Sequence, residues 1–213
     1  MNTYIDQYCE RLAPGFLAEP LNLLTNLAFI VAALCVYLLA RRNAVLTPAV
    51  LSLVLLIALT GIGSALFHAF ANAWSVWADI IPIILFQVVF ILAFSRRVLR
   101  LGVSVSAIIV ALFFVLSWLF SLVPQVLNNS LSYAPSLLVL AGFGVMQYRS
   151  RGRERSTLLY AAALFLCSLV FRTIDIAACD ALQTGTHFIW HLINGVVLYL
   201  VMRALVVNLE RAG

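Results

Sequence analysis

The three histidines of this chain lie in apolar stretches, where an imidazole needs a partner. His187 and His191 begin and end the run HFIWH, and His68 ends the run SALFH, four residues after Ser64. Ionisable side chains in an apolar, membrane-like setting are costly unless something binds them. Three neutral imidazoles that converge on one point form a zinc site with an open fourth position. The pattern therefore indicates metal chemistry inside an apolar environment.

The spacing of the histidines also indicates which other residues could take part. His187 and His191 project from one helix face, with the spacing of helical zinc ligands. Metalloprotease helices place a glutamate base directly after the first histidine, but Phe188 stands there, so we expect Asp79 to act as the base. Ser64 could donate to a metal-bound water or to a developing oxyanion. Zinc lowers the pKa of its water toward about 7 and polarises a carbonyl, which suits attack on an amide or ester.

Each of these residues also has a plainer interpretation. His68 alone could be a hydrogen-bonding residue between helices, and Ser64 a small packing residue beside Gly61 and Gly63. Asp79 alone would suit proton or ion transport. The three histidines and Asp79 taken together favour a metal site.

The composition predicts the elements that position these residues. The 213 residues are 64% hydrophobic and 10% charged, whereas soluble domains are roughly 45–50% apolar and about 25% charged. A bilayer span needs about 20 mostly apolar residues. We therefore expect an all-α membrane protein, a seven transmembrane helix bundle that forms a single domain over residues 1–213. The outer N-terminal segment is 1–21, and the expected spans lie near 22–40, 46–70, 74–95, 101–120, 130–148, 156–178 and 185–207.

The arginines predict the orientation of this bundle. Clusters follow the first, third and fifth spans, Arg203 lies near the end of the seventh, and the loops near 71–73, 121–129 and 179–184 contain no arginine. The positive-inside rule then places the N-terminus outside and the C-terminus in the cytoplasm. His68, His187, His191 and Asp79 would share one depth near the outer side. The net charge of +5 is thus explained by the orientation of the protein in the membrane. The arginines could also bind anionic lipid headgroups, and we expect no nucleic-acid binding.

Two more charged residues lie in the sixth span. Arg172 and Asp175 are three residues apart, so they could neutralise each other on one helix face. Alternatively, Arg172 orients a carboxylate that supports a metal ligand, or the pair controls substrate entry.

The predicted outer side also carries cysteines and oxygen ligands. Cys35 and Cys167 lie mid-span and are expected to pack, whereas Cys9 and Cys179 lie where disulfides persist and are either bridged or free thiols. Four residues in or next to the N-terminal segment carry oxygen ligands: Asp6, Glu10, Glu19 and Asn22. They could hold a calcium ion, or they could form a solvated acidic face near the membrane.

In order and spacing, these residues resemble the alkaline ceramidase family, part of a wider seven-span group that includes the adiponectin receptors. The motifs that carry the resemblance are YCE at 8–10, AEPLN at 18–22, SALFH at 64–68, Asp79, Asp175, Cys179 and HFIWH at 187–191. The resemblance implies zinc held by His68, His187 and His191, with a metal-bound water contacted by Asp79 and assisted by Ser64. It also implies a Cys9–Cys179 bridge and a lipid cavity between the spans. The calcium cluster of eukaryotic members is matched here at Glu10 and Glu19 but not at Gln7 and Leu12.

The leading hypothesis is a zinc-dependent intramembrane amidase that hydrolyses ceramide-like N-acyl lipids, entering from the bilayer, to a sphingoid base and a free fatty acid. Such a multi-pass protein would reside in the inner membrane of a bacterium or in the endoplasmic reticulum or Golgi of a eukaryote. A seven-span receptor or sensor with structural zinc is the first alternative, and reversed topology would favour it. A proton- or ion-coupled transporter is the second, and inverted repeats would support it.

Overall fold

The described residues, 4–123 and 126–209 of a computed structural model, form helices joined by short loops. Seven helical segments among them are long and apolar enough to cross a membrane, which confirms the predicted fold class. The first is a short helix α1 (Pro20–Thr25) continued by α2 (Leu27–Arg42). The next are α3 (Pro48–Phe70), α4 (Ala73–Arg97) and α5 (Val103–Ser121), and the last three are α6 (Ala134–Arg149) with the 3-10 turn η1 (Ser130–Tyr133) before it, α7 (Thr157–Ile174) and α8 (His187–Asn208).

The sixth predicted span extends beyond the helix that the structure shows. We expected the sixth span to continue through residue 178, but α7 ends at Ile174 and a 3-10 turn, η2 (Ile176–Ala178), follows. The next residue after α7 is Asp175, whose carboxylate accepts backbone N–H bonds from Thr186 and His187 at the start of α8. Apolar composition extends past this point, but the contacts of Asp175 with the start of α8 coincide with the end of α7.

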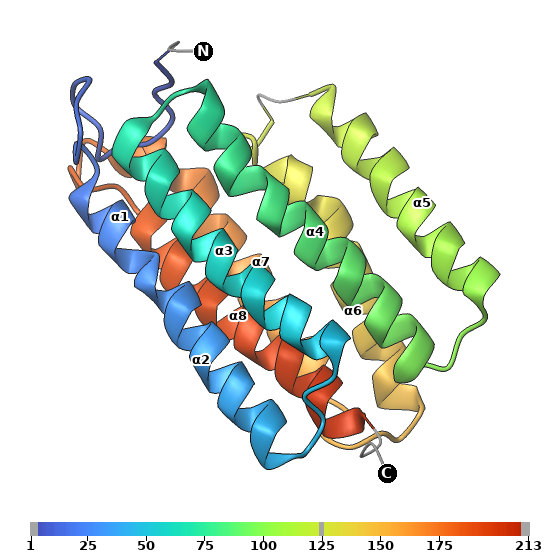
Figure 1. Cartoon of the computed structure of the whole chain (residues 1–213). Coiled ribbons are helices and arrows are strands. Elements are labelled where there is room, and N and C mark those ends of the chain that lie inside the picture. The colour runs from blue at the N-terminus through green and yellow to red at the C-terminus, as the bar shows by residue number, and fades with distance from the viewer. Residues whose placement is uncertain (1–3, 124–125, 210–213) are drawn as a thin grey trace.

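Successive spans run in opposite directions, and the two termini lie at opposite ends of the bundle (Figure 1). Helix α3 packs along α4, and α8 packs against α7 and α2, while α1 contacts both α3 and α8. The end at which α3 finishes and α8 begins is called the histidine end here. The opposite end carries Arg41, Arg42, Arg96, Arg97 and Arg149 in the last turns of α2, α4 and α6, and is called the arginine end. Which end faces the cytoplasm stays a prediction.

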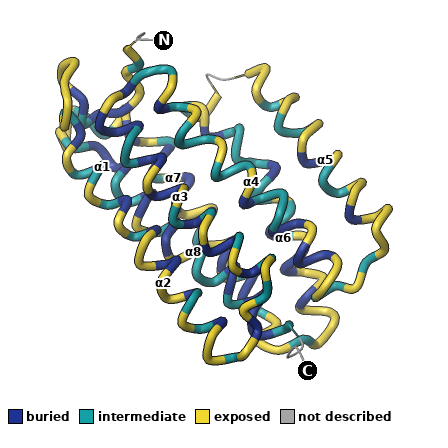
Figure 2. Tube along the Cα trace, viewed as in Figure 1, coloured by how far each residue is buried: buried dark blue, intermediate teal, exposed yellow. Residues whose placement is uncertain are grey.

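Exposed positions occur along all the helices (Figure 2). Many of them are large apolar residues. Helix α5 lies at one edge, and its main contacts are with α4, α6 and η1. Leu112, Val115 and Trp118 of this helix are exposed. Large exposed apolar surfaces are rare on soluble monomers, so the surface fits contact with lipid.

A close contact between α3 and α4 sets the position of two predicted site residues. A Cβ atom added at Gly63 would lie 2.0 Å from the carbonyl oxygen of Ala78. Only a glycine therefore lets the two backbones touch here, as small residues do at helix crossings in membranes. The contact brings the next residue of each helix, Ser64 and Asp79, into the same region.

The N-terminal segment folds over the histidine end. The backbone N–H of Ile5 donates to the carbonyl of Ala71 just after α3, and Tyr8 and Cys9 are buried. A disulfide joins Cys9 to Cys179, with 5.6 Å between their Cα atoms. Of the predicted outer segment 1–21, residues 1–3 lie outside the described part of the chain.

Candidate metal centre

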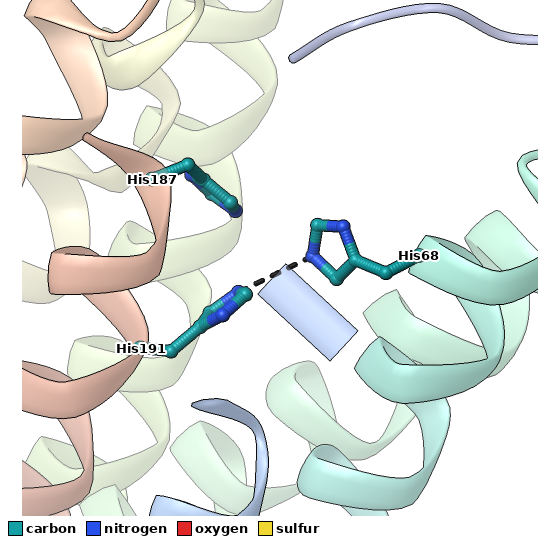
Figure 3. A group of neighbouring side chains, drawn as sticks. All are labelled: His68, His187 and His191. Carbon is teal, nitrogen blue, oxygen red and sulfur yellow. Dashed lines mark hydrogen bonds between the residues drawn. The ribbon is translucent and has the colours of Figure 1, made fainter. Parts of the chain in front are cut away.

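The three histidines meet at the histidine end, although 123 residues separate His68 from His191. His68 lies in the last turn of α3, and His187 and His191 lie in the first two turns of α8. One ring nitrogen from each lies within 4.8 Å of those of the other two, and all three side chains are buried. Figure 3 shows the rings pointing into the space between the two helices. These three histidines could hold a metal ion.

The hydrogen bonds of two rings define their tautomers. Nδ1 of His68 lies 2.5 Å from the carboxylate of Glu19, so this nitrogen carries the proton. Nδ1 of His191 lies 2.9 Å from the hydroxyl of Thr25. That hydroxyl donates to a backbone carbonyl one turn earlier in α1, so its oxygen accepts from Nδ1–H of His191. Both rings therefore keep a free lone pair on Nε2.

The two free lone pairs fit a shared metal ion. Nε2 of His68 and Nε2 of His191 lie 3.2 Å apart. Two nitrogens at about 2.0–2.1 Å from a tetrahedral ion lie roughly 3.3–3.4 Å apart. Two neutral acceptors at this distance repel each other unless a cation lies between them, and Nδ1 of His187 has no hydrogen-bond partner among the described residues. The donor set therefore suits a metal such as zinc.

Asp79 and Ser64 lie in the same cavity wall as two of the histidines, His187 and His191. Ser64 is buried, and the Asp79 oxygen Oδ1 is shielded from solvent without a hydrogen-bond partner in the described structure. A buried carboxylate oxygen without a partner is costly. Its position beside the histidines makes it available to an attacking water or to a substrate proton.

The cavity is a long apolar space between the helices. Its volume is about 150 Å³, and its lining extends from His191 to Val201 along α8. Ten residues of helix correspond to about 15 Å. Most of the lining away from the histidines is apolar and includes Phe86, Phe90, Phe113, Phe165 and Val197. The shape and chemistry suit a hydrocarbon chain.

A buried ionic network holds the His68 side of the centre. The carboxylate of Glu19 accepts from Nδ1 of His68, from Nε of Arg11 at 2.5 Å, and from the amide of Asn22 at 3.1 Å. Burial alone raises the pKa of the Glu19 carboxyl, but the hydrogen bonds and charges of His68 and Arg11 outweigh it, and the pKa lies below its ordinary value. Glu19 is therefore a carboxylate that orients His68, a candidate metal ligand.

A second buried carboxylate, that of Asp175, holds the α8 side. It accepts backbone N–H bonds from Cys9, Thr186 and His187, at distances of 3.0, 2.7 and 2.9 Å. The bonds fix the first residue of α8, which is a predicted ligand, and tie it to the N-terminal segment. An anion at a helix N-terminus is also favoured by the helix dipole.

The expected mutual neutralisation of Arg172 and Asp175 is wrong. The guanidinium of Arg172 donates instead to the carbonyl of Asn128 and the hydroxyl of Ser130, and it lies 5.1 Å from the ring centre of Tyr133. The i, i+3 spacing allowed the pair, but Asp175 satisfies three backbone donors that have no alternative. The two residues support different parts of the site.

Three of the predicted calcium ligands, Glu10, Glu19 and Asn22, lie close together, because both carboxylates accept from N–H groups of Asn22. Glu10 accepts the backbone N–H groups of Leu21 and Asn22 at the start of α1, Glu19 is bound as described above, and Asp6 is exposed. Among the described residues, a search for three or more His, Cys, Asp or Glu side chains close enough to share an ion finds the histidine triad. Donors from the protein bind the carboxylates of Glu10 and Glu19, whereas Oδ1 of Asn22 is buried without a hydrogen-bond partner in the described structure. A calcium site here stays a prediction.

Residues from the N-terminal segment and α1 complete the site, and sequence patterns did not mark their roles. Tyr8 stacks on His187 with 3.7 Å between ring centres, and burial raises the pKa of its phenol, so that it stays neutral. Arg11 contacts His68 and Glu19, and Thr25 contacts His191. Tyr8 and Glu19 belong to motifs noted above, but Arg11 and Thr25 carried no sequence signal. Cys35 and Cys167 are free thiols exposed on the outside rather than in the core.

The fold and the centre define a class: a seven-helix membrane protein with a buried histidine triad at one end of an apolar cavity. A family model described as Ceramidase matches residues 5–210, so the chain belongs to the ceramidase family. It is thus a hydrolase that acts on the amide bond of ceramide, which confirms the expected enzyme class. No curated protein matches the chain. Membership of an enzyme family favours catalysis over the receptor and transporter alternatives.

Proposed function

We propose that this ceramidase-family protein uses zinc, held by His68, His187 and His191, to hydrolyse ceramide-like N-acyl lipids to a sphingoid base and a free fatty acid. The observation that carries the proposal is the juxtaposition of three buried imidazoles with an unpartnered Asp79 oxygen at the polar end of an apolar cavity. When bound, zinc polarises the amide carbonyl and makes water a better nucleophile near neutral pH.

The residues around the triad have distinct parts in the proposed reaction. Asp79 takes a proton from the attacking water and passes it to the nitrogen of the leaving sphingoid base. Ser64 donates a hydrogen bond to the oxygen on which negative charge develops. Both directly follow the residues of the close α3–α4 contact, Gly63 and Ala78, which supports a joint role for them.

The apolar cavity positions the substrate. The acyl chain lies along α8 toward Val201, so that the amide reaches the histidine end, and the lipid enters laterally from the bilayer. By the arginine distribution, this end faces the outer side of the membrane.

The test is an assay of purified, zinc-quantified protein against ceramides of several acyl lengths and a set of other N-acyl lipids and acyl esters. We expect ceramide-like amides to be cleaved, and Asp79→Asn to lower kcat by about 10²- to 10⁴-fold with unchanged zinc content. Wild-type rates in Asp79→Asn would overturn its role as base. Cleavage of esters but of no amide by zinc-loaded wild type would overturn the proposed reaction.

A further inference from the structure

The guanidinium of Arg11 is completely buried beside a metal ligand. Its side chain has no exposed surface, and that of Glu19 is 1% exposed. Nε of Arg11 donates to Glu19, Nη2 donates to the backbone carbonyl of His68 at 2.6 Å, and Nη1 reaches the carbonyl of Gly15. No part of the apolar cavity wall is formed by Arg11, so it does not contact the acyl chain.

We propose that Arg11 is a built-in cation that positions His68 for the metal, beside carboxylates that the sequence marked as possible calcium ligands. This inference rests on the proposed metal centre. Arg11 is a positioning residue, because it acts through Glu19 and through the backbone of α3 and not on the substrate.

Two of the hydrogen bonds of Arg11 act on His68, one through Glu19 and one directly on the backbone. Through Glu19, the guanidinium fixes the carboxylate that holds Nδ1 of the ring. Through Nη2, it binds the carbonyl of the same residue in the last turn of α3, where helix carbonyls lack intrahelical partners. Ring and backbone of one ligand are thus held by one rigid, planar group. The flexible ammonium of lysine has a different donor geometry.

The charge of Arg11 also compensates the buried carboxylate of Glu19. A buried carboxylate requires a compensating positive charge and hydrogen-bond donors. Glu19 receives three donors, and Glu10 receives two backbone N–H groups. The protein itself therefore supplies the positive charge that the Glu19 carboxylate needs and hydrogen-bond donors to both carboxylates.

The chain contains a matched control for this pair. Arg203 and Glu154 also form a close ion pair, but it lies toward the arginine end and its side chains are 34% and 36% exposed. Replacing Arg203 removes the same type of residue and the same type of pair without touching the histidines.

The experiment measures metal affinity of the full-length protein by competition with a chromophoric chelator, and the absorption spectrum of the Co²⁺-loaded form. We expect Arg11→Ala to lower affinity for zinc about 10- to 100-fold, as losses of outer partners of metal ligands do, and to shift the Co²⁺ spectrum. Arg11→Lys, which keeps the charge, should lose less. Arg203→Ala should match wild type in both readouts.

Equal affinity and equal spectra in Arg11→Ala and Arg203→Ala would overturn the inference. If Arg11→Ala does not fold, Arg11→Lys decides, and wild-type affinity and spectrum in that variant overturn it. His191→Ala distinguishes a failure of the proposed metal centre from a failure of the role of Arg11. If wild type and His191→Ala bind metal equally, the proposed centre itself fails. If they differ while Arg11→Ala behaves as wild type, only the role of Arg11 fails.

Discussion

The histidine end and the arginine end of the bundle each contain an arginine–glutamate pair, and the two pairs differ in their surroundings. Arg11 and Glu19 are buried against His68, whereas Arg203 and Glu154 remain about one-third exposed. An exposed pair contributes little, because water and salt screen it. A buried pair is tolerated only when every donor and acceptor is satisfied. Residue type alone therefore does not define the role of an ion pair in this protein.

The same contrast applies to the connections within each end. At the histidine end, Cys9, Arg11 and Glu19 bind residues that are far away in the sequence, such as Cys179 and His68. At the arginine end, Asn208 binds the backbone of Arg153, but both partners lie in an exposed setting. These contacts span similar sequence distances at the two ends, so the difference between the ends lies in burial. We therefore expect the arginine end to tolerate substitution better.

The largest expected effect on stability is loss of the disulfide. Cys9→Ser should lower the free energy of unfolding by about 2–5 kcal/mol, because it frees the N-terminal segment from the loop before α8. Thermal unfolding in detergent measures the effect, and Cys167→Ser, which removes a free thiol, is the matched control. Equal unfolding temperatures for the two variants would contradict the distinction between the ends.

The helix contact at Gly63 should give an intermediate effect. Gly63→Ala places a Cβ atom against the Ala78 carbonyl and must push α3 away from α4, which we expect to cost about 1–3 kcal/mol and to reduce hydrolysis. Gly142→Ala is the control, because a Cβ there meets no atom within 4 Å and alanine favours helix. Thermal unfolding and ceramide hydrolysis measured together test this, and a neutral Gly63→Ala would show that the contact is not needed.

The smallest effect is expected at the exposed pair. Glu154→Gln should change the free energy of unfolding by about 0–1 kcal/mol, with any effect lost at high salt. Unfolding temperatures at low and high ionic strength measure it. A large loss of stability that does not depend on salt would mean that the ion pair at the arginine end contributes as a buried pair does, which would contradict the contrast between the ends.

The sequence predicted the helices well because each span is a local property of composition. The i, i+4 spacing of His187 and His191 and the common depth of His68 are also local or topological, so the triad was predictable. The partners of the ligands were not. Thr25 and Arg11 come from segments whose approach depends on how α1 and the N-terminal segment pack, and no periodicity encodes that.

Asp175 illustrates the same point for a residue that did stand out. Its spacing from Arg172 favoured a pair within one helix, a local contact of a few tenths of a kcal/mol. The structure gives it three backbone N–H donors from two distant segments. Satisfying buried backbone groups outweighs such a local pair, and only the tertiary fold shows that these groups need an acceptor.

The most direct test of the metal centre is elemental analysis of purified wild type and His191→Ala, combined with measurement of fatty acid released from ceramide. The account predicts about one zinc per wild-type chain, and loss of both the metal and the hydrolysis in His191→Ala. Full hydrolysis of ceramide by a metal-free His191→Ala protein would contradict it.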